Sequence, residues 1–124
     1  MRFLVLRAYG ELILFDLYLA RGNFAALYNK VRNYPVQTKN CFPQAVEQVC
    51  YAVDLASIWY WKEARCLQRS AATACLLKRS GVAARMVIGA QQVPFKAHAW
   101  VEVDGCVVND KPYMRETYGV LDQC

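Results

Sequence analysis

The chain has 124 residues, of which 56% are hydrophobic, and it carries a formal net charge of +5. This length allows one domain with its own core, and the hydrophobic content excludes a disordered protein. The positive charge is spread along the chain without a basic block, so we expect no nucleic-acid partner. We expect one domain over residues 1–124, helical over 1–62 and built from a helix and a sheet over 63–124.

The first apolar stretch, residues 1–19, raises the question of export or membrane insertion. Arg7, Glu11 and Asp16 interrupt it, and no small-residue cleavage site follows a clean apolar core. We therefore expect a cytoplasmic protein with no stable membrane insertion. The first helix, expected over residues 3–20, is apolar on several sides, so it either lies deep in the fold or is covered by a partner.

Two more helices are expected before the middle of the chain. Apolar residues at steps of three and four predict a helix over residues 24–33, with Asn23 as its cap. Residues 36–42 form an expected linker to a helix over residues 45–61, and Pro43 suits the first turn of that helix because its missing N–H is no loss there.

A central helix is expected over residues 66–79. Gly81 is placed as a left-handed stop, and basic residues occupy the last turn, where they suit the helix dipole. Residues 70–74 are all small, which favours close packing against other elements on most sides. The aromatic run over residues 59–61, just before this helix, is either a core anchor or a wall of a substrate groove.

Cysteine chemistry is expected at the start of the central helix. The unpaired N–H groups and peptide dipoles at a helix start favour a thiolate at Cys66, and Arg65 and Arg69 flank it. Cys75 lies nine residues further, or about 900° around the helix, so it faces the other way and is expected to pack in the core.

The other cysteines indicate reduced thiols and no metal. There are six cysteines and no Cys-x-x-Cys pair, and the single histidine cannot complete a typical zinc site. We expect most of the cysteines to be small core residues. No metal or other cofactor is expected.

The last third of the chain predicts a small antiparallel sheet. The expected order is a strand (84–90), a polar loop (91–96), a hairpin with strands 97–103 and 106–109, and a surface tail or short strand (113–124). The reversal is assigned to Asp104-Gly105, because glycine tolerates a positive φ.

The register of this hairpin determines whether its two polar residues can meet. A two-residue loop pairs Val103 with Cys106 and sets Asp110 on the other face from His98, whereas a three-residue loop bulged at Gly105 sets the two opposite each other. If the pair is functional, we expect the bulged loop.

In chain order, Cys66, His98 and Asp110 supply what nucleophilic cysteine catalysis needs: a thiolate, a base and a carboxylate that orients the base. The backbone N–H of Cys66 is a natural oxyanion donor. Gln68, Gln91 and residues 59–61 are candidates for a second donor. Taken singly, each member of the trio also fits a structural role.

Several motifs extend this arrangement beyond the three residues. They are Cys66-Leu67-x-Arg69-Ser70, Leu76-Leu77-Lys78-Arg79-x-Gly81, Val87-Ile88-Gly89, Ala97-His98-Ala99-Trp100-Val101-Glu102, and the stretch from Gly105 to Asp110. Together they resemble the McjB-type leader peptidases of lasso-peptide biosynthesis, which are compact members of the transglutaminase-like, papain-like cysteine protease superfamily. The resemblance is close over residues 66–110 and loose over the helical half. The chain departs from it in lacking a proline just before Cys66 and in having Cys106 within the hairpin.

The resemblance implies an α+β fold with a transglutaminase-like (papain-like) core, N-terminal helices, and a central helix headed by the nucleophile and packed on a small antiparallel sheet. It also implies that Cys66 is the nucleophile, that His98 is the general base and then the acid, and that Asp110 is the orienting carboxylate. The implied reaction removes the leader peptide from a ribosomally made precursor.

The implied partners are the precursor peptide, a small leader-recognition protein and an asparagine-synthetase-like cyclase. The apolar N-terminal helices are the candidate docking surface. Two alternatives stay open: amide transfer through the same thioester, and a non-catalytic protein that binds the precursor as a scaffold.

Overall fold

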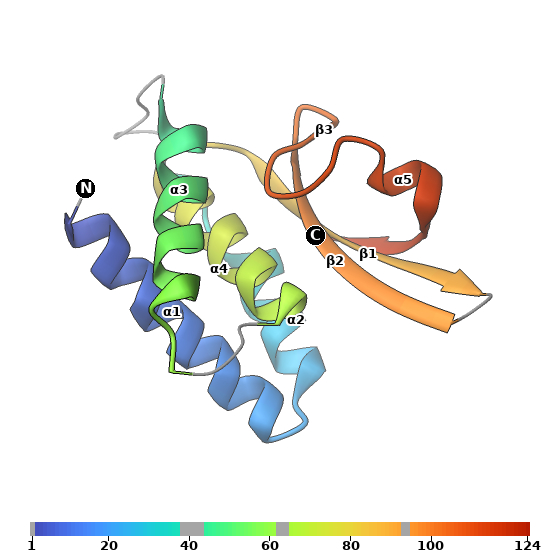
Figure 1. The fold of residues 1–124 in the computed structure, drawn as a ribbon, viewed down its shortest axis with the longest axis horizontal. Helices are drawn as coiled ribbons and strands as arrows, with labels where there is room; N and C mark the ends of the chain where they lie inside the picture. The colour runs from blue at the N-terminus through green and yellow to red at the C-terminus, as the bar shows by residue number, and fades with distance from the viewer. Residues whose placement is uncertain (1, 38–43, 62–64, 93–94) are drawn as a thin grey trace.

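The computed structural model describes residues 2–37, 44–61, 65–92 and 95–124. In chain order its elements are α1 (Arg2–Ala20), α2 (Phe24–Asn33), α3 (Ala45–Ile58), α4 (Cys66–Arg79), β1 (Ala84–Gln92), β2 (Phe95–Val103), β3 (Cys106–Val107), α5 (Met114–Thr117) and β4 (Gly119–Gln123). Helices α1 to α4 form one layer, the antiparallel sheet packs beside it, and α5 lies on the far side of the sheet (Figure 1). The predicted α+β class is confirmed, including the helix headed by Cys66.

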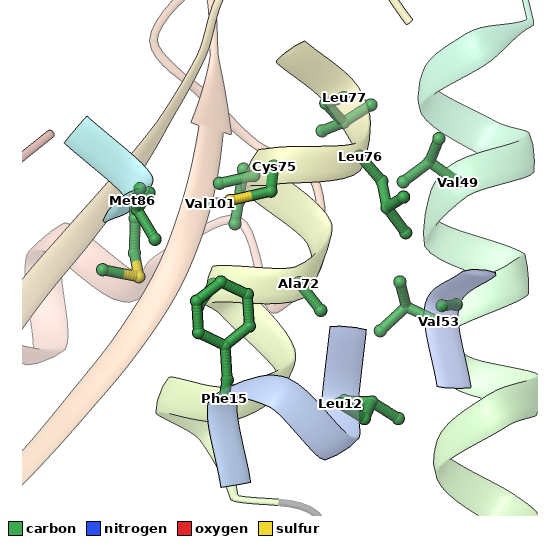
Figure 2. Packing of buried hydrophobic residues seen from close by; sticks show 14 of the residues in the cluster. Leu12, Phe15, Val49, Val53, Ala72, Cys75, Leu76, Leu77, Met86 and Val101 are labelled. Carbon is green, nitrogen blue, oxygen red and sulfur yellow. The ribbon is translucent and has the colours of Figure 1, made fainter. Parts of the chain in front are cut away.

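Helix α4 is the centre of the molecule, as its small residues predict. All of its residues from Ser70 to Lys78 are buried. Its core neighbours come from α1 (Leu12, Phe15), from α3 (Val49, Val53) and from the sheet (Met86, Val101), as Figure 2 shows. Cys75 lies in this core, as expected.

Helix α1 buries only part of its apolar surface. Ala8, Leu12 and Phe15 face the core, whereas Phe3 and Leu6 are among its exposed apolar residues. Among the described residues, no helix is long and apolar enough to cross a membrane.

Helix α3 ends at Ile58, three residues earlier than the periodicity predicts. The chain turns there because Tyr60 enters the core, where its hydroxyl donates a hydrogen bond to Asp16 Oδ2 at 2.8 Å. Trp59 and Trp61 are exposed. Within the aromatic run, therefore, only Tyr60 is a core anchor. Most of the predicted linker, residues 38–42, and Pro43 lie outside the described residues.

The sheet has the strand order β3-β2-β1-β4. Strands β1 and β2 pair from Ala84↔Val103 to Gln92↔Phe95. Residues 93–94 lie outside the described residues. The predicted loop over residues 91–96 is therefore wrong for residues 91–92 and 95–96, which belong to the strands. Polar residues there belong to the exposed end of a two-stranded ribbon, where polarity does not distinguish strand from loop. Of the two alternatives for the tail, the short strand is correct, because β4 pairs with β1.

Candidate active site

The reversal at Asp104-Gly105 is a two-residue turn. Both residues have positive φ, 52° and 78°, which is the signature of a type I′ turn, and Val103 pairs with Cys106. The predicted three-residue loop bulged at Gly105 is therefore wrong. The I′ turn matches the right-handed twist of the flanking strands, which explains why it forms without a bulge.

His98 and Asp110 nevertheless meet, with 2.6 Å between His98 Nε2 and Asp110 Oδ2. This contact is possible because β3 ends at Val107, so Asp110 is not bound by the alternation of strand side chains. The expectation that a two-residue turn would separate the pair assumed a strand that continues to residue 109.

The side chain of Asn109 explains where the strand pairing stops. Val108 N still donates to Val101 O, but Val101 N donates to Asn109 Oδ1 at 2.7 Å. The carbonyl of Val108 instead accepts a hydrogen bond from the Cys50 thiol at 3.4 Å. An amide side chain thus takes the place of the next backbone carbonyl, and the chain turns so that the following residue reaches His98.

The Asp110 carboxylate is held at both oxygens. Oδ2 contacts His98, and Oδ1 accepts a hydrogen bond from the backbone N–H of Lys111 at 2.8 Å. Partial burial raises the pKa of this carboxyl, but the hydrogen bonds and the charge of Arg69 together bring the pKa below its ordinary value. Asp110 is therefore ionised at neutral pH.

The imidazole of His98 lies within a group of aromatic rings. It stacks on Tyr118, with ring centroids 5.4 Å apart and an angle of 22°, and on Trp100, at 6.3 Å and 27°. The side chains of His98 and Asp110 are 25% and 26% exposed, so the pair is accessible but not fully solvated.

Cys66 and His98 line the same pocket, which has a volume of about 130 Å³. The other lining residues are apolar: Phe24, Leu67, Ile88, Ala97 and Ala99. Cys66 is half-buried and is the first residue of α4, where backbone N–H groups lack partners within the helix. A second pocket, of about 360 Å³, shares Phe24 and Ile88 with the first and extends along α2 toward β4.

Hydrogen bonds fix the start of α4 against the strand that bears His98. Ser70 Oγ donates to the carbonyl of Ala99 at 3.0 Å and accepts from Asn109 Nδ2 at 3.1 Å. The helix that presents the thiol is thus joined to Ala99, which follows His98 in the chain, and to Asn109, which precedes Asp110.

Among the described residues, two of the candidates for a second oxyanion donor, Gln68 and Gln91, do not line the pocket that contains Cys66. The amide of Gln68 is fully buried, donates to Leu12 O at 2.6 Å and accepts from Arg65 N at 3.2 Å, so it serves the helix packing and not the pocket.

The described cysteines differ more than the sequence predicts. Burial raises the pKa of the Cys50 thiol to about 11 and that of Cys75 to about 12, and it raises the pKa of Cys124 as well. Cys106 is exposed, contrary to the expectation that most cysteines are core residues, and only Cys75 is fully buried among the five described. The described residues contain no group of three or more metal-ligating side chains.

Three residues around His98 escape prediction from the sequence. Asn109 reads as the end of a strand, Gly89 as an ordinary strand residue, and Tyr118 as part of a surface tail. Only Gly89 carries a recognisable signal, since a glycine inside a strand often marks a close approach by another group.

The fold agrees with what comparison with known proteins shows. A sequence model of the transglutaminase-like superfamily matches residues 12–123, so the chain belongs to that superfamily, whose members are generally cysteine peptidases or transferases. The chain is also similar to the microcin J25-processing protein McjB of Escherichia coli, with 43% identity over 56 residues. That alignment covers 45% of this chain and 27% of McjB, and it confirms the resemblance predicted from the sequence. No solved structure matches the chain.

Proposed function

We propose that this chain is a single-domain cytoplasmic cysteine peptidase that removes the leader from a ribosomally synthesised precursor, as in lasso-peptide maturation. The observation that carries the proposal is the His98–Asp110 pair, 2.6 Å apart, beside a pocket that also contains Cys66 at the start of α4. Membership of the superfamily and the similarity to a microcin-processing protein support the same activity.

The proposed mechanism assigns one role to each nitrogen of His98. Ionised Asp110 accepts a hydrogen bond from Nε2–H, so Nδ1 is the nitrogen left to take the proton of the Cys66 thiol. The thiolate sulfur attacks the carbonyl carbon of the scissile bond, the C–N bond breaks, and Nδ1–H protonates the leaving amine. Water, deprotonated by Nδ1, then hydrolyses the thioester and regenerates the thiol.

The substrate we propose is an extended stretch of precursor around the junction of leader and core. The pocket at Cys66 is open and lined largely by apolar groups, which suits a peptide side chain next to the cleaved bond. A small leader-recognition protein would deliver this precursor, and an asparagine-synthetase-like cyclase would act on the freed core. The exposed apolar residues of α1, such as Phe3 and Leu6, are the proposed docking surface for such a partner.

The test is cleavage of the cognate precursor in the presence of the recognition protein, followed by mass spectrometry. Wild type should release a leader peptide that ends in a free carboxylate and a core peptide with a free N-terminal amine. Cys66→Ala should release neither peptide. Cys106→Ala is the matched control, because Cys106 is exposed in the hairpin turn region and does not line the pocket; it should cleave at the wild-type rate. Unchanged cleavage by Cys66→Ala would refute the proposal, and an adduct with an added amine would identify amide transfer instead.

A further inference from the structure

We infer that Tyr118 is a positioning residue for His98, holding the imidazole so that Nε2 meets Asp110 while Nδ1 faces the thiol. This inference rests on the proposed peptidase function for its consequence, but its structural basis is independent of any substrate. It concerns a side chain in the last seven residues of the chain, outside the region of the three catalytic candidates.

The ring of Tyr118 packs almost parallel to the imidazole, at 5.4 Å and 22°, and it also contacts Trp100, at 6.1 Å and 40°. Trp100 in turn lies 6.3 Å from the imidazole. His98 is therefore one of three mutually packed rings. Since the torsion that rotates an imidazole has a broad profile, such packing restricts an angle that the side chain does not restrict by itself.

The backbone fixes Tyr118 on both sides. Its N–H donates to Met114 O at 2.9 Å at the end of α5, and the next residue, Gly119, pairs with Ala90 of β1. Met114 is buried in a small core with Trp100 on this face of the sheet. The tyrosine is thus held at the junction of a helix end and a strand start.

The structure leaves room for the three rings only because residue 89 is glycine. Gly89 pairs with His98 in the register of β1 and β2. A Cβ atom at this position would lie 2.6 Å from Trp100 Cη2 and 2.9 Å from Tyr118 Cβ, which is closer than side chains approach. The absence of a side chain at Gly89 therefore allows both rings to pack down on the strand.

An ion pair between the buried Glu102 and the half-exposed Arg115 joins α5 to β2. Arg115 donates to both carboxylate oxygens of Glu102, at 2.7 and 2.9 Å, and Trp100 Nε1–H donates to Glu102 Oε2 at 2.8 Å. Glu102 therefore accepts hydrogen bonds both from Arg115 of α5, the helix that precedes Tyr118, and from the indole ring of Trp100, which packs against Tyr118. These contacts link the three rings to both β2 and α5.

The contacts of His98 with Asp110 and with Tyr118 restrict different motions of the imidazole. The hydrogen bond to Asp110 fixes one ring nitrogen but permits the ring to tilt about that bond. Contact with Tyr118 along the ring face opposes the tilt, so loss of the tyrosine ring should misplace Nδ1. Such a defect lowers kcat and leaves KM nearly unchanged, because the group acts on the thiol and not on substrate binding.

The first test uses the fact that His98 is the only histidine in the chain, so that its NMR signals need no assignment by mutation. The probes are wild type, Tyr118→Phe, Tyr118→Leu and, as matched control, Tyr113→Leu, which removes an exposed tyrosine outside the ring group. Wild-type and Tyr118→Phe imidazole protons should be shielded by the ring, and Tyr118→Leu should shift them downfield and change the Nδ1/Nε2 tautomer populations. Unchanged imidazole signals in a folded Tyr118→Leu protein would overturn the inference.

The second test measures precursor cleavage by the same proteins. Tyr118→Leu should lose on the order of tenfold in kcat with KM within about twofold, and Tyr118→Phe should recover most of the rate. Equal kcat in Tyr118→Leu and wild type would contradict positioning. If wild type itself cleaves nothing, the peptidase proposal fails, while the NMR comparison still decides whether Tyr118 orients His98. If Tyr118→Leu does not fold, the comparison is between Tyr118→Phe and wild type. A kcat of Tyr118→Phe well below that of wild type, with its ring still stacked on the imidazole, would refute a role for the ring.

Discussion

At the scale of single residues, the His98–Asp110 contact carries the most chemical information. The carboxylate engages Nε2, and Lys111 N–H holds its other oxygen, so the carboxylate has one orientation. Asp110→Asn keeps the shape but removes the charge that stabilises an imidazolium. We expect the cleavage rate to fall by about 10² to 10⁴, with thiol alkylation at Cys66 slowed as well. Steady-state kinetics with precursor measures this effect.

The control for that substitution is Asp104→Asn, which makes the same chemical change in the exposed type I′ turn. Asparagine before glycine suits this turn, so the variant should fold and cleave like wild type. If the two variants had equal rates, the role assigned to the Asp110 carboxylate would be wrong.

The pH dependence of Asp110 follows from the direction of its pKa. Because the pKa in the folded protein lies below the ordinary value of 3.8, the folded state binds the proton less tightly than the unfolded state. The stability from this carboxylate is complete above pH 3.8 and is lost as the pH falls through the folded pKa. The difference in unfolding free energy between wild type and Asp110→Asn should therefore be constant near neutrality and shrink in acid. Urea titrations at several pH values measure it, and a difference that grew in acid would contradict the pKa direction.

The identity of the candidate residues could be predicted, but the way they meet could not. The positions of Cys66 and His98 follow from a helix start and a β pattern. The contact with Asp110 depends on Asn109 replacing a backbone acceptor, which is a tertiary choice that no local pattern encodes. For the same reason the contact between His98 and Asp110 forms with a two-residue turn, although the bulged loop was predicted to be required for it.

At the scale of elements, two glycines make a matched comparison. Gly89→Ala forces a Cβ against Trp100 and Tyr118, so we expect it to destabilise the protein by about 1–3 kcal/mol and to disturb the His98 signals. Gly10→Ala adds a methyl group with nothing within 4 Å in the middle of α1, so it should stabilise by about 0.5–1 kcal/mol. Thermal unfolding of both variants tests this, and a neutral Gly89→Ala would show that the rings can move aside.

The element boundaries show where sequence patterns end and tertiary packing begins. Helices α2 and α4 coincide with their predicted ranges, because capping by Asn23 and termination near Gly81 are local. Helix α3 ends early because Tyr60 is drawn to Asp16, which is far away in the sequence. Strand β3 is shorter than predicted because Asn109 terminates its ladder.

At the scale of the whole molecule, buried polar side chains join α4 to α1, α2 and β2. Gln68 donates to Leu12 O of α1, and Lys78 Nζ donates to Val31 O of α2 at 2.6 Å. Ser70 donates to Ala99 O of β2. A buried polar group that loses its partner is costly, so these bonds specify one arrangement of the helices and the sheet as well as stabilising it.

The join between the helical layer and the sheet can be measured as a coupling between Ser70 and Asn109. Asn109→Ala leaves Val101 N–H without its acceptor and should cost about 1–3 kcal/mol, whereas Asn109→Asp keeps that acceptor and loses only the donor to Ser70. In a double-mutant cycle with Ser70→Ala, we expect a coupling of about 0.5–3 kcal/mol from urea unfolding. Asn109→Ala should also slow cleavage beyond its effect on stability, because Asp110 then loses the turn that brings it to His98. If Asn109→Ala kept wild-type activity at full folding, the position of Asp110 would have to be fixed by His98 and Lys111 alone.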